Sequence, residues 1–210
     1  MADVNRDAVA LESAADVQYN RGMVVTVDEI YLPLTLCAPG ITDDRFDELC
    51  QLYEDFRVEY TAEGDVLVMP PTDEETGMRN SSINYQLMRW ALTNERGAVT
   101  DSSTGFRLPN GARRSADAAW ISRQRLGKRP NCPEFVIELL TSSDRRTVAR
   151  AKMQEWIDNG AELGWMIDPK SKSVTIYRTG REPEIRTGLN ELAGEGVVDG
   201  FVLDLDPVWK

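Results

Sequence analysis

The sequence predicts a mixed α+β fold in which a central β-sheet of mixed strand direction carries helices on both sides. Three segments place apolar residues at helical spacing, and between them lie short runs with the pattern of strands. One run, Phe135 to Leu140, is apolar almost throughout, which is typical of a strand covered on both faces. The 210 residues suffice for one domain of ordinary size with its own hydrophobic core.

We expect one domain with a short N-terminal appendage. Residues 1–25 show little periodicity beyond a weakly helical stretch, Asp7–Asp16, and we expect this appendage to be partly disordered. Residues 26–210 contain no repeat and no low-complexity segment, and we expect them to form the domain.

Three helices are predicted, each from an apolar stripe. In the first helix, Phe46, Leu49, Cys50 and Tyr53 occupy positions i, i+3, i+4 and i+7. Polar residues precede the first and third helices as N-caps, and a glycine follows the second and third as a stop signal. The predicted helices are 43–56 behind Thr42, 76–95 before Gly97, and 144–159 between the cap segment 141–144 and Gly160.

The strands are predicted from alternating or continuous apolar runs that are bounded by turn residues. A turn-like Ala-Glu-Gly joins two such runs into a hairpin, and Pro-Asn-Gly at 109–111 marks another turn. The hairpin strands are 57–61 and 65–69, and the other predicted strands are 99–103, 105–108, 117–121, 134–140, 162–167, 173–177, 184–186, 197–198 and 201–205.

The composition excludes several classes of enzyme. Because the chain has no histidine, it lacks the imidazole that Ser-His-Asp and Cys-His nucleophile systems and most zinc or iron sites require. Cys37, Cys50 and Cys132 are odd in number and widely spaced, which indicates a reducing compartment without a disulfide framework. Neither a signal peptide nor a membrane span is visible. We therefore expect a cytoplasmic protein that uses carboxylate, lysine or hydroxyl chemistry.

Charge is distributed unevenly along the chain. A net charge of −11 argues against a nucleic-acid partner, because phosphate binding depends on Lys and Arg. Residues 105–152 nevertheless carry 11 basic and 4 acidic groups, against 7 and 20 in residues 1–104 and 6 and 11 in residues 153–210. This basic segment is either a solvated surface, the usual role of such charge, or a local field that attracts phosphate.

Two acidic residues stand in apolar strand segments. Glu138 interrupts the run 135–140, and Asp117 lies in Ala-Asp-Ala-Ala-Trp-Ile. Burial of an ionised carboxylate is unfavourable by several kcal/mol unless the group is paired or binds a cation. Together the two acids would make an oxygen-ligand site for a divalent cation. If its helix folds back over the strand, Lys152 would position an attacking water or help to deprotonate it, and would oppose the charge that develops on the phosphate.

Each of these residues also has an ordinary structural explanation. Glu138 could form an internal salt bridge with one of the arginines between 145 and 150, Asp117 could cap a turn, and Lys152 could be an exposed helix charge. The presence of all three within the basic segment favours a site.

Three stretches of the sequence resemble one known family. They are Ser-Ser-Thr-Gly-Phe-Arg-Leu-Pro-Asn-Gly at 102–111, Arg-Ser-Ala-Asp-Ala-Ala-Trp at 114–120, and Pro-Glu-Phe-Val-Ile-Glu-Leu-Leu-Thr-Ser-Ser-Asp at 133–144. In this order, and with further likeness at 152–160 and 164–169, the chain resembles the Uma-type restriction endonuclease family, a branch of the PD-(D/E)XK nuclease superfamily.

The resemblance implies a restriction-endonuclease-like core, a mixed sheet flanked by helices with an N-terminal β-hairpin and helical appendage. It also implies a divalent metal, Mg²⁺ or Mn²⁺, at an acidic site. Asp117 matches the first acid of the motif and Glu138 the second, while Lys152 matches a lysine moved onto the following helix. Glu59 is a further candidate metal ligand beside Asp117 and Glu138.

The sequence departs from the family pattern in two places. Ala116 stands where a proline is usual, and Leu140 where the superfamily places its lysine.

The leading hypothesis is a metal-dependent endonuclease that hydrolyses phosphodiester bonds of DNA, acting as a homodimer. The alternative is a weakly active or inactive nuclease-fold protein that serves as a binding or interaction module. The candidate catalytic residues are Asp117, Glu138 and Lys152, and the candidate DNA-binding residues are Arg107, Arg113, Arg114, Arg145 and Arg146.

Overall fold

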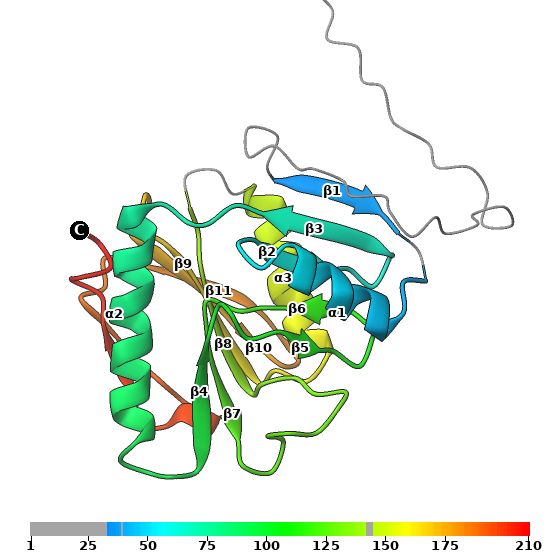
Figure 1. Ribbon diagram of the computed structural model, residues 1–210. Coiled ribbons are helices and arrows are strands. Elements are labelled where there is room, and N and C mark those ends of the chain that lie inside the picture. The colour runs from blue at the N-terminus through cyan, green and yellow to red at the C-terminus, as the bar shows by residue number, and fades with distance from the viewer. Residues whose placement is uncertain (1–32, 39, 142–144) are drawn as a thin grey trace, which may run out of the picture. The chain divides into compact units, whose positions relative to one another are not determined.

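The computed structural model describes residues 33–38, 40–141 and 145–210 (Figure 1). The predicted appendage, its helical stretch and the domain boundary at residue 26 lie outside the described residues. So does most of the cap segment that we predicted for the third helix, residues 142–144. No helix in the described ranges is long and apolar enough to cross a membrane.

The described residues form a central six-stranded sheet. Its neighbouring strands are antiparallel except for one parallel pair, β8 and β9, so the predicted mixed sheet is confirmed. The parallel pair arises because a helix connects these two strands, as a crossover requires. In order across the sheet the strands are β11 (Arg181–Thr187), β10 (Ser173–Arg178), β9 (Leu163–Asp168), β8 (Phe135–Leu139), β7 (Ala118–Ser122) and β4 (Gly97–Asp101).

A second sheet of five strands contains the predicted hairpin, and all its pairs are antiparallel. The helix α1 (Asp43–Leu52) begins behind its N-cap Thr42, as predicted, and buries Phe46 beside Tyr60. Two strands of this sheet, β1 and β6, were not predicted from the sequence. In order across the sheet the strands are β1 (Leu34–Cys37), β3 (Asp65–Met69), β2 (Arg57–Tyr60), β6 (Arg113–Arg114) and β5 (Phe106–Arg107).

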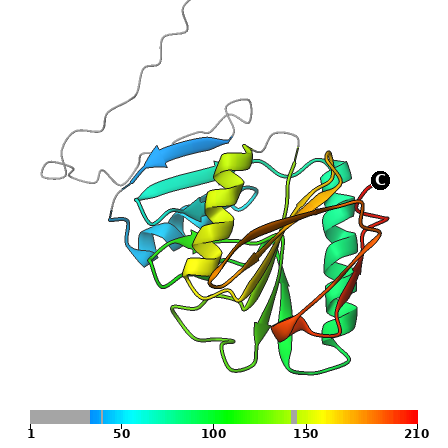
Figure 2. The same cartoon turned by 180° about the vertical axis from the view of Figure 1, so that it is seen from behind.

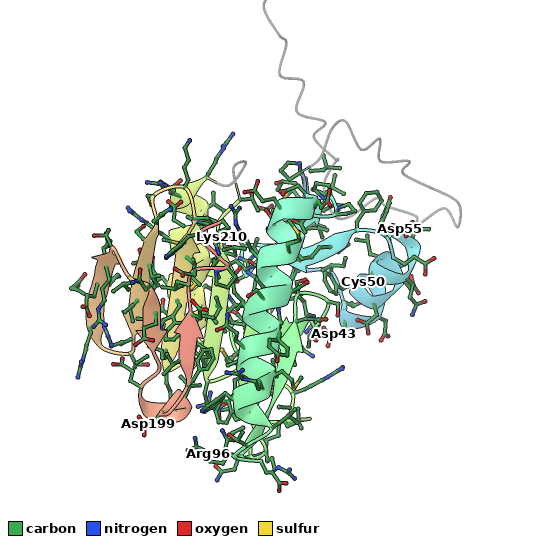
Figure 3. All side chains as sticks on the ribbon, turned by 90° about the vertical axis from the view of Figure 1, so that its left-hand side faces the viewer. Asp43, Cys50, Asp55, Arg96, Asp199 and Lys210 are labelled. Carbon is green, nitrogen blue, oxygen red and sulfur yellow. The ribbon has the colours of Figure 1, made fainter. Side chains whose placement is uncertain are left out.

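The two longer helices cover opposite faces of the central sheet (Figures 1 and 2). On one face α2 (Glu74–Ala91) packs Ile83 and Leu87 into a core with Phe135, Ile137 and Leu139. In Figure 3, which faces α2, Arg96 is labelled just beyond the lower end of this helix.

On the other face α3 (Arg146–Asp158) packs Met153 and Trp156 into a second core with Val136. A Cβ on Gly164 of β9 would lie 2.4 Å from Cε of Met153, so α3 approaches the sheet closely only because glycine stands there.

Three further details of the prediction were wrong. Residues 197–198, predicted as a strand, lie in the 3₁₀ helix η2 (Gly196–Val198), where the backbone N–H groups of Val198 and Asp199 donate to the carbonyl oxygens of Glu195 and Gly196. The third helix begins at Arg146 rather than at 144, and its N-cap Arg145 makes no side-chain capping bond. The strand β12 (Glu191–Ala193), which pairs with β13 (Val202–Asp204), was not predicted.

The three cysteines are free thiols with very different environments. Cys37 is exposed, whereas burial raises the pKa of Cys132 to about 12. Burial and the nearby Asp47 also raise the pKa of Cys50. The thiolate is the reactive form, and at pH 8 a thiol with a pKa of about 12, such as that of Cys132, is ionised in about one molecule in 10,000.

With Ellman's reagent at pH 8, we expect Cys37 to react first and Cys132 only after urea unfolds the protein. Fast release of three equivalents from the folded protein would contradict this order.

Candidate active site

Four residues singled out in the sequence lie together between the two sheets and α3. Glu59 is in β2, Asp117 directly precedes β7, Glu138 is in β8 and Lys152 is in α3. Strand alternation explains why Glu138 faces α3, because its neighbours Phe135, Ile137 and Leu139 all pack on the α2 side. The three carboxylates are buried. The third helix therefore folds back over β8, which is the condition for Lys152 to reach the acids.

Lys152 joins two of the acids. Its Nζ donates to Oε1 of Glu59 at 2.9 Å and to the backbone oxygen of Ser115 at 2.8 Å, and lies 2.9 Å from Oε1 of Glu138. Two of the three N–H donors of the ammonium group thus form hydrogen bonds, and Glu138 is its ion-pair partner. The ordinary explanation for Lys152, an exposed helix charge, is excluded because only 14% of its side chain is accessible to solvent.

The charges of this cluster shift one another's pKa. Burial alone would lower the pKa of Lys152, but Glu138 and Glu59 hold it above its usual value. Burial alone would raise the pKa of Glu59, but Lys152, Arg57 and Arg114 hold it below its usual value. At Glu138 burial prevails and raises the pKa to about 7, with Lys152 opposing and the neighbouring carboxylates of Asp117 and Glu59 adding to the effect. The cluster thus contains a protonated lysine beside a carboxylate that is strained in its charged form.

Asp117 is fixed by groups from three elements. Its Oδ2 accepts a hydrogen bond from the backbone N–H of Leu139 at 2.8 Å, which ties it to β8. Its Oδ1 accepts from Nη1 of Arg57 at 3.2 Å. Its backbone oxygen accepts from Nδ2 of Asn84, on α2, at 2.9 Å. Asp117 therefore has a defined orientation beside Glu138 rather than a role in capping a turn.

Two members of the site were not predicted from the sequence. Trp156 donates from Nε1 to Oε1 of Glu138 at 2.9 Å, and Arg57 contacts Asp117. Both have a signal in the sequence. Trp156 follows Lys152 by four residues, which places both on one face of a helix, and Arg57 precedes Glu59 by two residues, which places both on one side of a strand.

The site borders a cavity of about 1980 Å³. This volume exceeds the few hundred to about 1,000 Å³ that is usual for small-molecule pockets, so it suits part of a polymer better than a metabolite. Arg57, Glu59, Asp117, Glu138 and Lys152 are all among its lining residues.

The candidate DNA-binding arginines differ in their surroundings. Arg107 and Arg113 both pair with Asp43, which lies at the start of α1 and is labelled in Figure 3. Arg114 is buried between Glu59 and Glu155, so its charge belongs to the internal network. Arg146 pairs with Asp168, and Arg145 is exposed at the start of α3. Of these, Arg107, Arg113, Arg114 and Arg145 line the cavity.

The donor set suits a divalent cation bound by two carboxylates. Within the described ranges, no group of three or more His, Cys, Asp and Glu side chains is arranged to hold a metal ion. Glu59 is turned toward Lys152 and Arg114. Asp117 and Glu138 remain, and Mg²⁺ is commonly held by one or two carboxylates with water and phosphate oxygens completing its shell. Both carboxylates are buried, and the negative charge of Asp117 helps to raise the pKa of Glu138, so a bound divalent cation would reduce an unfavourable interaction.

The chain matches the model of a known protein family. The model of the Uma2 family, described as "Putative restriction endonuclease", matches residues 43–206. That range contains all four residues of the cluster. No curated protein matches the chain.

Comparison with solved structures gives a similar fold. A crystal structure from Anabaena variabilis, described as "a putative nuclease belonging to DUF820", superimposes with a TM-score of 0.64 at 17% sequence identity. The match covers 72% of this chain and 89% of that one. At this identity the likeness concerns the fold, and it confirms the predicted fold class.

Proposed function

The chain belongs to the Uma2 family, whose model is described as "Putative restriction endonuclease", and from that premise we propose that it is a metal-dependent endonuclease that hydrolyses phosphodiester bonds of DNA. One observation gives the proposal its main support. A buried ammonium group, Lys152, holds Glu138 and Glu59 beside Asp117 at the wall of a cavity larger than a metabolite needs. Paired buried carboxylates of this kind are unfavourable for stability alone, which supports a role in chemistry.

Asp117 and Glu138 are the residues that would hold Mg²⁺ or Mn²⁺. When bound, such an ion neutralises charge that develops on the phosphate and makes water a better nucleophile. Trp156 and the backbone N–H of Leu139 orient these carboxylates. Glu59 holds the lysine in place from the other side and is less suited to be a ligand, because Lys152 and Arg114 engage its oxygens.

Lys152 acts through its positive charge. Because its pKa is raised, the ammonium keeps its proton at neutral pH and cannot take one from water. It orients Glu138, and its charge opposes the negative charge of the scissile phosphate. The role of a lysine that helps to deprotonate water, which the sequence left open, is therefore not the one we propose.

Basic side chains around the cavity would contact the DNA backbone. Lys128, Arg129 and Arg145 line the cavity along with Arg107 and Arg113. Phosphate contacts position the substrate and depend on salt, so we expect DNA binding to weaken as the NaCl concentration rises.

We also propose that two copies act together, since a duplex has two strands to cut and a symmetric dimer supplies two sites. Three free thiols suit the cytoplasm as the place of action.

Conversion of supercoiled plasmid tests the proposal. We expect the protein with Mg²⁺ or Mn²⁺ to produce nicked and then linear DNA, and EDTA to abolish the conversion. The Asp117→Asn variant, purified in the same way, is the control for contaminating nuclease. Asp199→Asn, at an exposed residue labelled in Figure 3, is the control for the loss of one carboxylate.

Two results would contradict an active nuclease. Equal cleavage by wild type and Asp117→Asn would show that Asp117 takes no part in cleavage. A wild type that retards DNA in Ca²⁺ but does not cut it in Mg²⁺ or Mn²⁺ would favour the alternative function, an inactive binding module.

A further inference from the structure

A guanidinium group contacts Asp117, one of the two carboxylates that we propose as metal ligands. Arg57 places Nη1 3.2 Å from Oδ1 of Asp117, and its Nε lies 4.0 Å from Oε1 of Glu59. The other oxygen of Asp117 is engaged by the backbone N–H of Leu139. The carboxylate oxygen that faces away from the β8 backbone is therefore the one that Arg57 contacts.

Arg57 is the local counter-charge for several acids. Burial alone would lower the pKa of its guanidinium, but Glu59, Asp117 and Glu138 together hold it above its usual value. Glu59 has two further cationic partners, Lys152 and Arg114. Asp117 has its ion pair with Arg57. Removal of Arg57 would thus leave the negative charge of Asp117 less balanced by nearby positive charge than that of Glu59.

Arg57 is partly exposed at the wall of the cavity. About a third of its side chain, 34%, is accessible to solvent, compared with 14% for Lys152. Within the part of the chain that the structure describes, it also donates a weak hydrogen bond from Nη2 to Sδ of Met69 at 3.4 Å. It lines the cavity, so a rotation away from Asp117 keeps the guanidinium within the same space.

We propose that Arg57 occupies the place of the cation at Asp117, that a divalent metal ion displaces it, and that the displaced guanidinium then contacts the phosphate backbone in the cavity. This inference rests on the proposed function and adds a regulation to it, because metal binding and DNA binding become coupled through one side chain. A cation cannot share Oδ1 with a guanidinium without strong repulsion, so the two compete. A planar guanidinium is well suited to a phosphate once it is released.

The proposal requires opposite effects from one substitution. In Arg57→Gln the competitor is absent, and we expect Mn²⁺ to bind at least ~5-fold more tightly, the lower end of typical coupling between sites. DNA binding in the presence of Ca²⁺ should weaken in the same variant. A residue with a merely structural role would not tighten metal binding when it is removed.

Isothermal titration with Mn²⁺ in the absence of DNA measures the first effect. The control is Arg178→Gln. Arg178 lies on β10, outside the site, and pairs with Glu184 and Glu195. Arg57→Lys keeps the charge and should retain an affinity nearer to wild type. Equal or weaker Mn²⁺ binding by a folded Arg57→Gln variant would overturn the inference while the proposed function stands. Absence of Mn²⁺ binding in both wild type and Arg57→Gln would overturn the proposed function as well.

A measurement on the wild type does not depend on how the variant folds. The Nε–H signal of Arg57 in ¹⁵N-arginine-labelled protein, assigned by its loss in Arg57→Lys, should shift and exchange faster with water when Mg²⁺ is added. An unchanged signal at saturating Mg²⁺ would overturn the displacement.

Discussion

The Glu138→Gln variant is expected to lose at least ~1,000-fold in metal-dependent DNA cleavage and to become more stable at the same time. The loss follows because a metal contributes several kcal/mol to the transition state and each 1.36 kcal/mol is tenfold in rate. The amide keeps an oxygen that can accept from Lys152 and Trp156, which are the present partners of Oε1. The packing should therefore be retained.

The gain in stability has a defined pH dependence. Burial raises the pKa of Glu138 to about 7 from an ordinary value of 4.5, so the folded state loses stability as the pH rises from 4.5 to about 7, and the loss stays constant at higher pH. Below pH 4.5 the carboxyl is protonated in both states and the difference disappears. In EDTA at pH 8, we expect the free energy of unfolding of Glu138→Gln to exceed that of wild type by roughly 1–3 kcal/mol, and the excess to shrink toward pH 4.5.

Urea unfolding at several pH values, combined with plasmid cleavage, measures both effects. Glu182→Gln, at an exposed position of β11, is the matched control and should change neither quantity. Loss of stability at pH 8, or cleavage within tenfold of wild type, would contradict the assignment of Glu138 as a strained functional carboxylate.

The Lys152→Met variant is expected to be destabilised by about 3–5 kcal/mol at pH 8. Methionine fills similar space but leaves Glu59 and Glu138 in the interior without the ammonium that both contact at 2.9 Å. Breaking a buried ion pair by removal of one partner typically has an effect of this size, because the remaining charge is desolvated and unpaired. The expected destabilisation is smaller at pH 5, since the raised pKa of Glu138 lets that carboxyl take up a proton.

Thermal and urea unfolding of Lys152→Met at pH 5 and pH 8 test this expectation. Lys170→Met, at an exposed position between β9 and β10, is the control for loss of a positive charge. A destabilisation below about 1 kcal/mol would place Lys152 with ordinary surface charges, whose pairs contribute that little.

Part of the site was predictable because charge stands out in an apolar strand. Glu138 within Phe-Val-Ile-Glu-Leu and Asp117 within Ala-Asp-Ala-Ala require partners on the evidence of their neighbours in the chain alone. Arg57 shows the opposite case, because nothing local links it to Asp117, which is 60 residues away. The arginine reaches that carboxylate only through the packing of β2 against the central sheet, and strand alternation alone cannot predict which element faces it.

The amino-acid sequence by itself determined the class of fold, the helices and most strands, the exclusion of histidine chemistry, and the two acids that require a partner. Periodicity and the unfavourable burial of charge are properties of short segments, so they can be recognised without coordinates. The tertiary structure alone decided which cations those acids receive. Lys152 lies 93 residues from Glu59 in the chain. The two side chains meet because α3 folds back over β8, and because strand β2 of the second sheet, which carries Glu59, lies beside α3. The identity of such a partner depends on how whole elements pack, and the energy of a buried charge depends on that partner.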